Sequence, residues 1–106
     1  MVNPRIGQTG LVFEVQTIEE DESGTQTPLN PSTATTKQIE FFGPQGINFK
    51  KDASESQSGS DWFLTYTDPD TSSILTKPGT WYMAHHIVKS DGKISRGSPT
   101  PFEVDP

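Results

Sequence analysis

The longest alternating stretch of the sequence runs from Thr80 to Lys89 and reads TWYMAHHIVK. Successive side chains of a β-strand point to opposite faces, so Trp81 and every second residue after it, up to Ile87, would share one face. The turn Ser90-Asp91-Gly92-Lys93 follows, and Asp-Gly tolerates the positive dihedral angles that two-residue hairpin turns require. The pattern predicts a long strand, a tight turn and a return strand that begins at Ile94.

A second hairpin is predicted earlier in the chain. In the run from Thr35 to Phe42, Ile39 and Phe41 share one face. The run ends at Gly43-Pro44-Gln45-Gly46, and proline and glycine suit the central positions of a tight turn. Apolar residues alternate again from Ile47 to Ala53, so we expect two antiparallel strands joined by that turn.

Three further runs have the alternation of strands. The run from Gly10 to Glu19 has a mostly apolar face, made of Leu11, Phe13, Val15 and Thr17. Another strand, the fourth in chain order, is expected where Trp62, Leu64 and Tyr66 alternate with other residues. The run from Thr100 to Val104 predicts a last strand, at the edge of a sheet.

The segments between these runs are expected to be irregular. Ser54 to Ser60 has the composition of a polar linker, and Thr71 to Lys77 has room for one short helical turn. Residues 19–34 are predicted to form a long loop on the surface. The carboxylates of Glu19 to Glu22 would repel one another in a strand pair, and prolines 28 and 31 lack backbone donors.

Composition limits the class of protein. The chain has 106 residues, no cysteine and a formal net charge of −6. The charge argues against binding to nucleic acid or to an anionic membrane, and the missing cysteines exclude disulfides and thiolate sites. No apolar run is long enough for a transmembrane helix or the core of a secretory signal. We expect a chain made in the cytoplasm.

Six or seven short strands at intervals of roughly ten residues, separated by turns, are typical of an all-β fold. We predict an immunoglobulin-like two-sheet β-sandwich, a single domain over residues 1–106, with Trp62 and Trp81 as the bulk of its core. Residues 1–9 and 99–106 are expected to be partly extended arms, since both contain proline and few core candidates.

The two histidines do not predict a metal or catalytic site. His85 and His86 are adjacent, so on a strand they would point to opposite faces. We expect His85 in the core beside Trp81 and Met83, and His86 on the surface. The sequence also lacks the G-x-S-x-G motif of a serine nucleophile, so a hydrolase is not predicted.

Other candidate sites are weak. The cluster Glu19 to Glu22 and the pair Asp68 and Asp70 have carboxylates for calcium but not the spacing of a calcium loop, so solvated turns are the better interpretation. Four glycines form no phosphate-binding motif: Gly7, Gly10, Gly43 and Gly46. No catalytic, cofactor-binding or metal residue is predicted, and no binding residue can be assigned. Three aromatic residues are candidates for stacking on a sugar or a partner: Phe42, Phe63 and Tyr82.

Short motifs at a particular spacing carry a resemblance to a family. They are Ser32 to Gln38, Pro44-Gln45-Gly46, Leu75, Gly79-Thr80-Trp81, Asp91-Gly92 and Phe102-Glu103-Val104. With this spacing, residues 32–104 resemble the N-terminal β-sandwich of bacteriophage baseplate upper proteins and related tail and neck fibre proteins. A weaker likeness extends over Gly7 to Val15. The segment from Glu19 to Pro31 is longer and more acidic than the usual connection.

The resemblance implies a virion structural protein of the tail, baseplate or neck, with no enzyme activity and no cofactor. It would anchor or adapt other virion proteins, as a homo-oligomer or in many copies in a symmetric assembly. Two alternatives stay open: a capsid decoration protein on the head lattice, and a carbohydrate-binding adhesin module.

Overall fold

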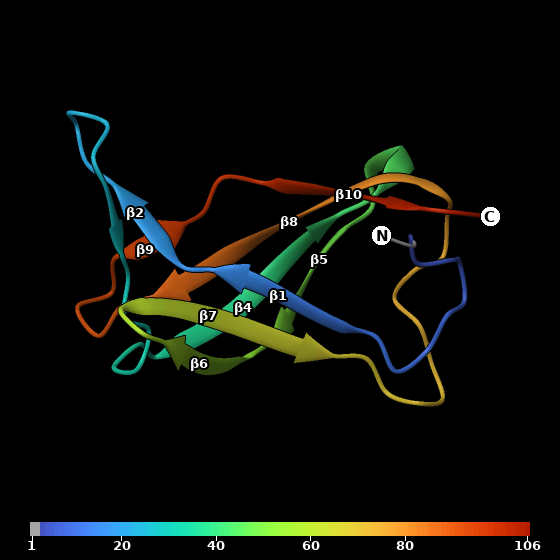
Figure 1. The fold of residues 1–106 in the computed structure, drawn as a ribbon, viewed down its shortest axis with the longest axis horizontal. Helices are drawn as coiled ribbons and strands as arrows, with labels where there is room; N and C mark the ends of the chain where they lie inside the picture. The colour runs from blue at the N-terminus through green and yellow to red at the C-terminus, as the bar shows by residue number, and fades with distance from the viewer. Residues whose placement is uncertain (1–2) are drawn as a thin grey trace.

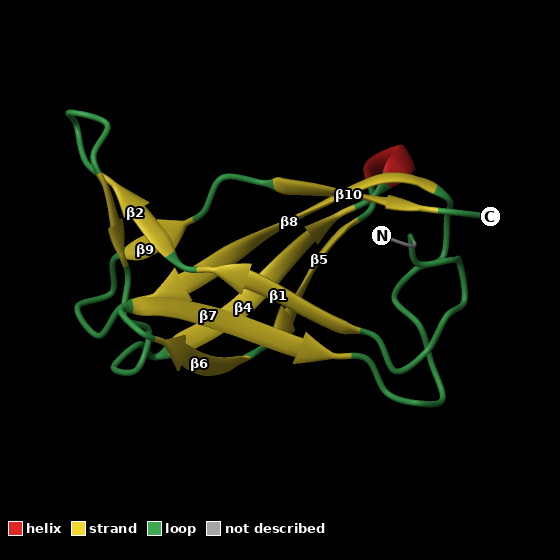
Figure 2. Cartoon of the chain, viewed as in Figure 1, coloured by secondary structure: helices red, strands yellow, loops and turns green. Residues whose placement is uncertain are grey.

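The structure is a computed structural model that describes residues 3–106, and it is all-β (Figure 1). The strands are β1 (Val12–Gln16), β2 (Ile18–Glu20), β3 (Gln26–Pro28), β4 (Thr36–Phe42), β5 (Asn48–Asp52), β6 (Ser54–Ser58), β7 (Asp61–Thr67), β8 (Gly79–Val88), β9 (Ile94–Arg96) and β10 (Thr100–Val104). One 3-10 turn, η1 (Pro44–Gly46), lies between β4 and β5 (Figure 2). Within the described residues, no helix is long and apolar enough to cross a membrane.

The strands form two main sheets and a separate hairpin. The smaller sheet has the order β1-β7-β6, and the larger has the order β10-β8-β4-β5, with β9 pairing the second half of β8. Every strand pair is antiparallel. Phe13 of β1 meets Phe41 of β4 edge-to-face at 5.2 Å between ring centres, so the inner faces of the two sheets pack on each other.

The core confirms most of the predicted inward faces. Ile39, Phe41, Leu64 and Trp81 are fully buried. The indole N–H of Trp81 donates to the carbonyl oxygen of Lys77 at 3.0 Å, so the one polar group of this side chain is satisfied. Trp62 differs from the prediction because it is half-buried near the start of β7, away from the centre of the core.

The hairpin predicted between residues 35 and 53 is present as β4, η1 and β5. Gln45 has φ +61° at its turn, in the left-handed region, and Gly46 beside it has φ +80°. Gly43 lies against the indole of Trp81, and a Cβ at this position would meet ring atoms at 3.0 Å. This turn is therefore packed against the core.

Two segments differ in structure from the prediction. Ser54 to Ser60, expected as a linker, contains β6, which pairs with β7. Thr71 to Lys77 does not form the expected helical turn. The carboxylate of Asp68 accepts the N–H of Ile74, and the Ser73 hydroxyl accepts the N–H of Leu75, so side chains replace the backbone bonds of a helix.

The predicted loop over residues 19–34 is partly a β-hairpin. Glu19 pairs with Thr27 and Glu20 with Gln26, in the hairpin β2-β3, which projects from the sandwich (Figure 1). The carboxylates are tolerated there because this hairpin is solvated and Glu19 forms a 2.7 Å ion pair with Lys89. The hairpin and β6 raise the number of strands above the predicted six or seven.

The arm predicted at residues 99–106 contains β10, which belongs to the larger sheet. Phe102 and Val104 pack into the core. The described part of the N-terminal arm is tied to it, since Arg5 and Asp105 form a parallel bridge and Asp105 donates its N–H to the carbonyl oxygen of Pro4 at 2.8 Å. The rest of that arm, residues 1–2, lies outside the described residues.

Candidate binding surfaces

The outer face of the larger sheet carries a buried carboxylate. Glu40 is only 3% exposed, although it points away from the core. Its Oε1 accepts a 2.7 Å bond from Arg96, and its Oε2 accepts a 3.0 Å bond from Asn48 and lies 4.0 Å from Lys50. The side chains of three strands, β4, β5 and β9, thus converge on one carboxylate. We call these four residues the Glu40 cluster.

Electrostatics keep the cluster ionised. Burial raises the pKa of the Glu40 carboxyl, but the hydrogen bonds from Asn48 and Arg96 and the charges of Arg96 and Lys50 outweigh it and lower the pKa below 4.5. The Arg96 side chain is 59% exposed, so its remaining donors face solvent. The cluster can present fixed donors to a ligand or partner.

Apolar groups flank the cluster at both ends of this face. Phe42 and Tyr82 are cross-strand partners, and Pro101 of β10 is the next neighbour of Tyr82. At the other end, Val88 pairs with Ile94, whose side chain is 61% exposed. The face therefore combines an aromatic end, a charged centre and an aliphatic end.

The histidines lie as predicted, on opposite faces of β8. His85 is buried on the inner face, and burial lowers its pKa below 6.5 despite opposing effects of Glu19 and a backbone hydrogen bond with Gln16. His86 is half-buried on the outer face, where burial and then the charge of Lys50 lower its pKa. The two rings do not converge on one site.

His85 has a partner that the sequence did not predict. Its Nε2 lies 3.0 Å from the hydroxyl of Ser95 on β9. Gly97 packs against the other side of the ring, where a Cβ would come within 2.7 Å of Nδ1. The neutral ring is thus held between two elements, which is the arrangement of a satisfied core histidine.

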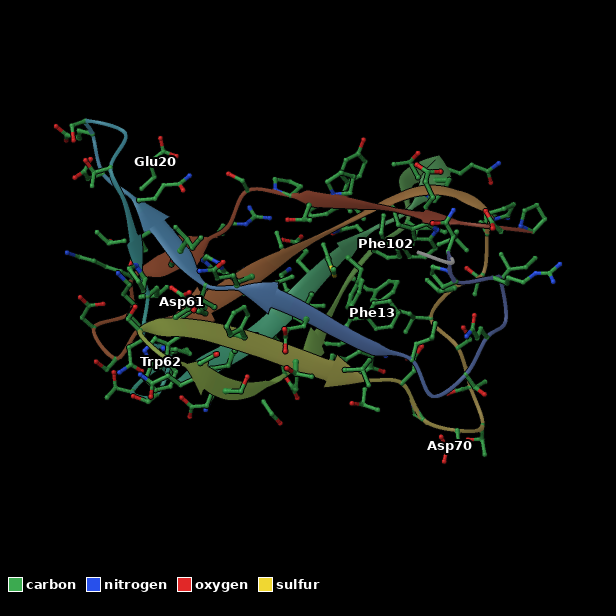
Figure 3. All side chains as sticks on the ribbon, in the orientation of Figure 1. Phe13, Glu20, Asp61, Trp62, Asp70 and Phe102 are labelled. Atoms are coloured by element: carbon green, nitrogen blue, oxygen red, sulfur yellow. The ribbon has the colours of Figure 1, made fainter. Side chains whose placement is uncertain are left out.

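The side of the sandwich between β1 and β10 is an open seam. Phe13 and Phe102 approach each other across it, with ring centres 5.8 Å apart (Figure 3). One end holds a cavity of about 400 Å³ with a largely apolar wall, including Leu11, Phe13, Met83 and Phe102. The other end holds a cavity of about 520 Å³ whose lining includes Val15, Met83, His85, Glu19 and Glu20.

The acidic candidates do not form cation sites. Asp21 is a turn residue whose carboxylate accepts bonds from the Ser23 hydroxyl and two backbone N–H groups, and these bonds lower its pKa. Asp68 is buried, whereas Asp70 is exposed in the following loop (Figure 3). Within residues 3–106, no group of three or more histidine, aspartate and glutamate side chains could hold a metal ion.

The remaining candidates belong to separate parts of the molecule. Gly7 and Gly10 lie in the turns that lead to β1, and Gly43 and Gly46 flank or end η1. Phe63 is half-buried on β7 of the smaller sheet, away from Phe42 and Tyr82 on the larger one. The sequence pattern did not single out Glu40 or Arg96, which are 56 residues apart, as partners.

Comparisons of the chain with protein-family models, with curated proteins and with solved structures found no match.

Proposed function

We propose that this chain is a non-enzymatic structural module of a bacteriophage virion, made in the host cytoplasm and acting as an anchor or adaptor in the tail, baseplate or neck. The observation that carries the proposal is the outer face of the larger sheet, where the Glu40 cluster lies between exposed apolar groups. The virion setting rests on the sequence resemblance over residues 32–104.

The side-chain composition of this face favours a protein partner. Aromatic side chains and arginine are enriched in protein interfaces, and Tyr82 and Arg96 are the most exposed aromatic and basic groups of the face. Glu40 holds the arginine in place before a partner arrives, which reduces the ordering cost of binding. In a symmetric assembly, many copies of a modest contact of this kind would give firm attachment.

The strand order supports an immunoglobulin-like sandwich. The order β1-β7-β6 corresponds to strands B-E-D of that fold, and β10-β8-β4-β5 corresponds to G-F-C-C′. In this assignment the Glu40 cluster lies on strands C and C′ and on β9, at the start of the G region. An immunoglobulin-like frame is compatible with many functions, so it adds to the proposal only by supplying a rigid sheet face.

The experiment is immunogold labelling of particles made from the genome that encodes this chain. We expect label on the tail, baseplate or neck, and a copy number far below that of the major capsid protein. Label over the head, with hundreds of copies, would replace the proposal by capsid decoration. Particles without the chain would overturn it, and saturable binding on a glycan array would then favour an adhesin.

A variant pair tests the surface itself. Tyr82→Ser with Arg96→Ala should reduce incorporation of the chain into particles, because the substitutions remove the aromatic group and the exposed cation. Thr67→Ser on the exposed end of β7 is the matched control and should leave incorporation unchanged. Equal incorporation of all variants, each shown to be folded, would contradict docking through this face.

A further inference from the structure

We infer that the open edge of β1 accepts an extended segment of another protein, which adds to the smaller sheet as a strand. The segment has a large apolar side chain at one position and a lysine or arginine two residues away. This inference deepens the proposed function, on which it rests, by stating the chemistry of one partner. Here the chain is the acceptor of a strand.

The backbone of β1 has hydrogen-bonding groups free for such a strand. Asp68 donates to the carbonyl oxygen of Leu11, and Thr17 donates to that of Trp62, so the odd-numbered residues of this run bond to β7. In an antiparallel ladder the alternate residues direct their N–H and C=O groups to the other side. The backbone groups of Val12, Glu14 and Gln16 therefore face the seam, where Gln16 already bonds to His85 and the groups of Val12 and Glu14 remain for a guest strand.

The two cavities of the seam match the spacing of an added strand. Phe13 lines the apolar cavity and Val15 lines the polar one, and these residues are two positions apart on β1. A strand rises about 6.6 Å over two residues, so a guest strand would direct side chains i and i+2 toward the two cavities. Leu11, Met83 and Phe102 would surround the first of these side chains.

Charge determines the class of the second side chain. The charged groups that line the two cavities are Arg5, Glu14, Glu19, Glu20 and Arg96. Arg5 donates to Pro106, Arg96 to Glu40, and Glu19 pairs with Lys89. Among the described residues, Glu20 of the polar cavity has no ion pair, so a cationic side chain that enters this cavity has a carboxylate to meet.

The same charges argue against a second copy as the occupant. Each copy has a net charge of −6. A two-fold pairing of two β1 strands centred on Glu14 would place two carboxylates opposite each other, which is destabilising.

The two edges of the larger sheet carry the usual protection against strand addition. β10 has Pro101 among the residues that face outward, since Asp105 directs its backbone groups to Pro4 and Ile6. β5 has Lys50 and Lys51. β1 and β6, the edges of the smaller sheet, have neither proline nor lysine, but only β1 lines the two cavities.

The probe is a synthetic peptide of about seven residues with one leucine, a lysine two residues after it and threonine at the other positions, which is long enough to cover β1. The chain has two methionines, and Met83 lines both cavities, so a chain labelled with 13C at the methionine methyl groups reports on the seam directly. We expect the Met83 methyl resonance to shift and saturate as the peptide is added. An absent shift would overturn the inference.

Two changes separate strand addition from simple charge attraction. Glu14→Pro removes a donor that faces the seam and leaves the β1-β7 ladder intact, so it should weaken binding about tenfold. Glu14→Gln keeps the donor and should weaken binding less. Should Glu14→Pro fail to fold, the native chain is tested with a peptide N-methylated at the alternate amides that would donate to β1, which should not bind. Equal binding of the N-methylated peptide would overturn strand addition.

Further experiments identify the binding site and the molecule that occupies it. Gln57→Ser, at an exposed position of β6 on the far edge of the smaller sheet, should leave peptide binding unchanged, and loss of binding there would place the contact elsewhere. A shift of Met83 with rising chain concentration and no peptide, together with dimers in ultracentrifugation, would replace the guest by a second copy. A chain that is present in particles but binds no peptide refutes this inference alone, whereas peptide binding by a chain absent from particles refutes the proposed virion role alone.

Discussion

Trp81 is the residue on which the core depends most. Its side chain is fully buried, its indole contacts Phe49 and Phe102, and its N–H is bonded to Lys77. We expect Trp81→Ala to lower the free energy of unfolding by about 3–5 kcal/mol, which is enough to unfold a marginally stable domain. A denaturant melt measures the loss. The half-buried Trp62→Ala is the control and should cost less, and a loss below about 1 kcal/mol for Trp81→Ala would contradict the assignment.

His85 makes stability depend on pH in a particular window. Burial lowers its pKa below the 6.5 of the unfolded chain, so the unfolded state binds more protons as the pH falls through 6.5. The free energy of unfolding should therefore decrease from pH 7.5 to pH 5. His85→Gln should flatten this decrease, and His86→Gln, at the less buried ring, should flatten it less. An equal pH dependence of all three chains in melts would contradict the expected role of His85.

Glu40 makes stability depend on pH in a lower range than His85 does. Its folded pKa is below 4.5, so the stability that it contributes is complete above that value and is lost as the pH falls through the lowered pKa. We expect Glu40→Gln to cost about 1 kcal/mol at pH 7, because Arg96 and Lys50 are exposed enough to be rehydrated. The cost should decrease as the pH falls below 4.5 and through the lowered pKa. A cost that does not change as the pH falls would indicate lost packing instead of lost charge.

The β2-β3 hairpin separates into a dispensable tip and a structural base. Replacing residues 21–25 by a two-residue turn should leave the melting temperature nearly unchanged, since these residues are exposed. Shortening the whole segment from Glu19 to Pro31 should unfold the domain. Thr17 is buried and exchanges hydrogen bonds with Leu29, and Pro31 is fully buried. Circular dichroism of the two deletions decides between these outcomes.

The elements that alternation predicted are those with one buried face. β4, β5, β7 and β8 all follow from their inward apolar residues. β6, with the sequence SESQS, has mostly exposed side chains at the edge of a sheet, so its pairing leaves no apolar pattern to detect. In β2 and β3 the hairpin projects into solvent, where charge and proline are tolerated.

The binding surfaces were less predictable than the fold. Tyr82 was a candidate from its alternation with Trp81, but the Glu40 cluster joins side chains of β4, β5 and β9. Only strand order and register bring such residues together, and a local pattern contains neither. The seam depends equally on what lies beside β1, which no segment of the sequence indicates.

At the scale of the whole molecule, the C-terminal segment is part of the fold. A chain ending at Ser98 lacks β10 and exposes the core residues beside Phe102 and Val104, so we expect it to be unfolded or strongly destabilised. Removal of residues 1–4 alone should be much milder, because the described residues of this segment, Asn3 and Pro4, are exposed and half-buried. A cooperative melt of the chain ending at Ser98 at the temperature of the full chain would contradict this.

One of the crossings between the two sheets is made by a single residue. β5 ends at Asp52 and β6 begins at Ser54, so Ala53 alone connects the layers on that side, where its N–H bonds to Lys37. The layers are covalently joined at this margin, whereas β1 and β10 on the opposite side belong to different sheets and are not paired with each other. We therefore expect the two sheets to separate transiently on the side of β1 and β10 while they stay joined at Ala53. Amide hydrogens near Phe102 should then exchange with deuterium faster than those near Ala53. The largest motions would therefore occur beside the open edge of β1, where we infer that a guest strand binds.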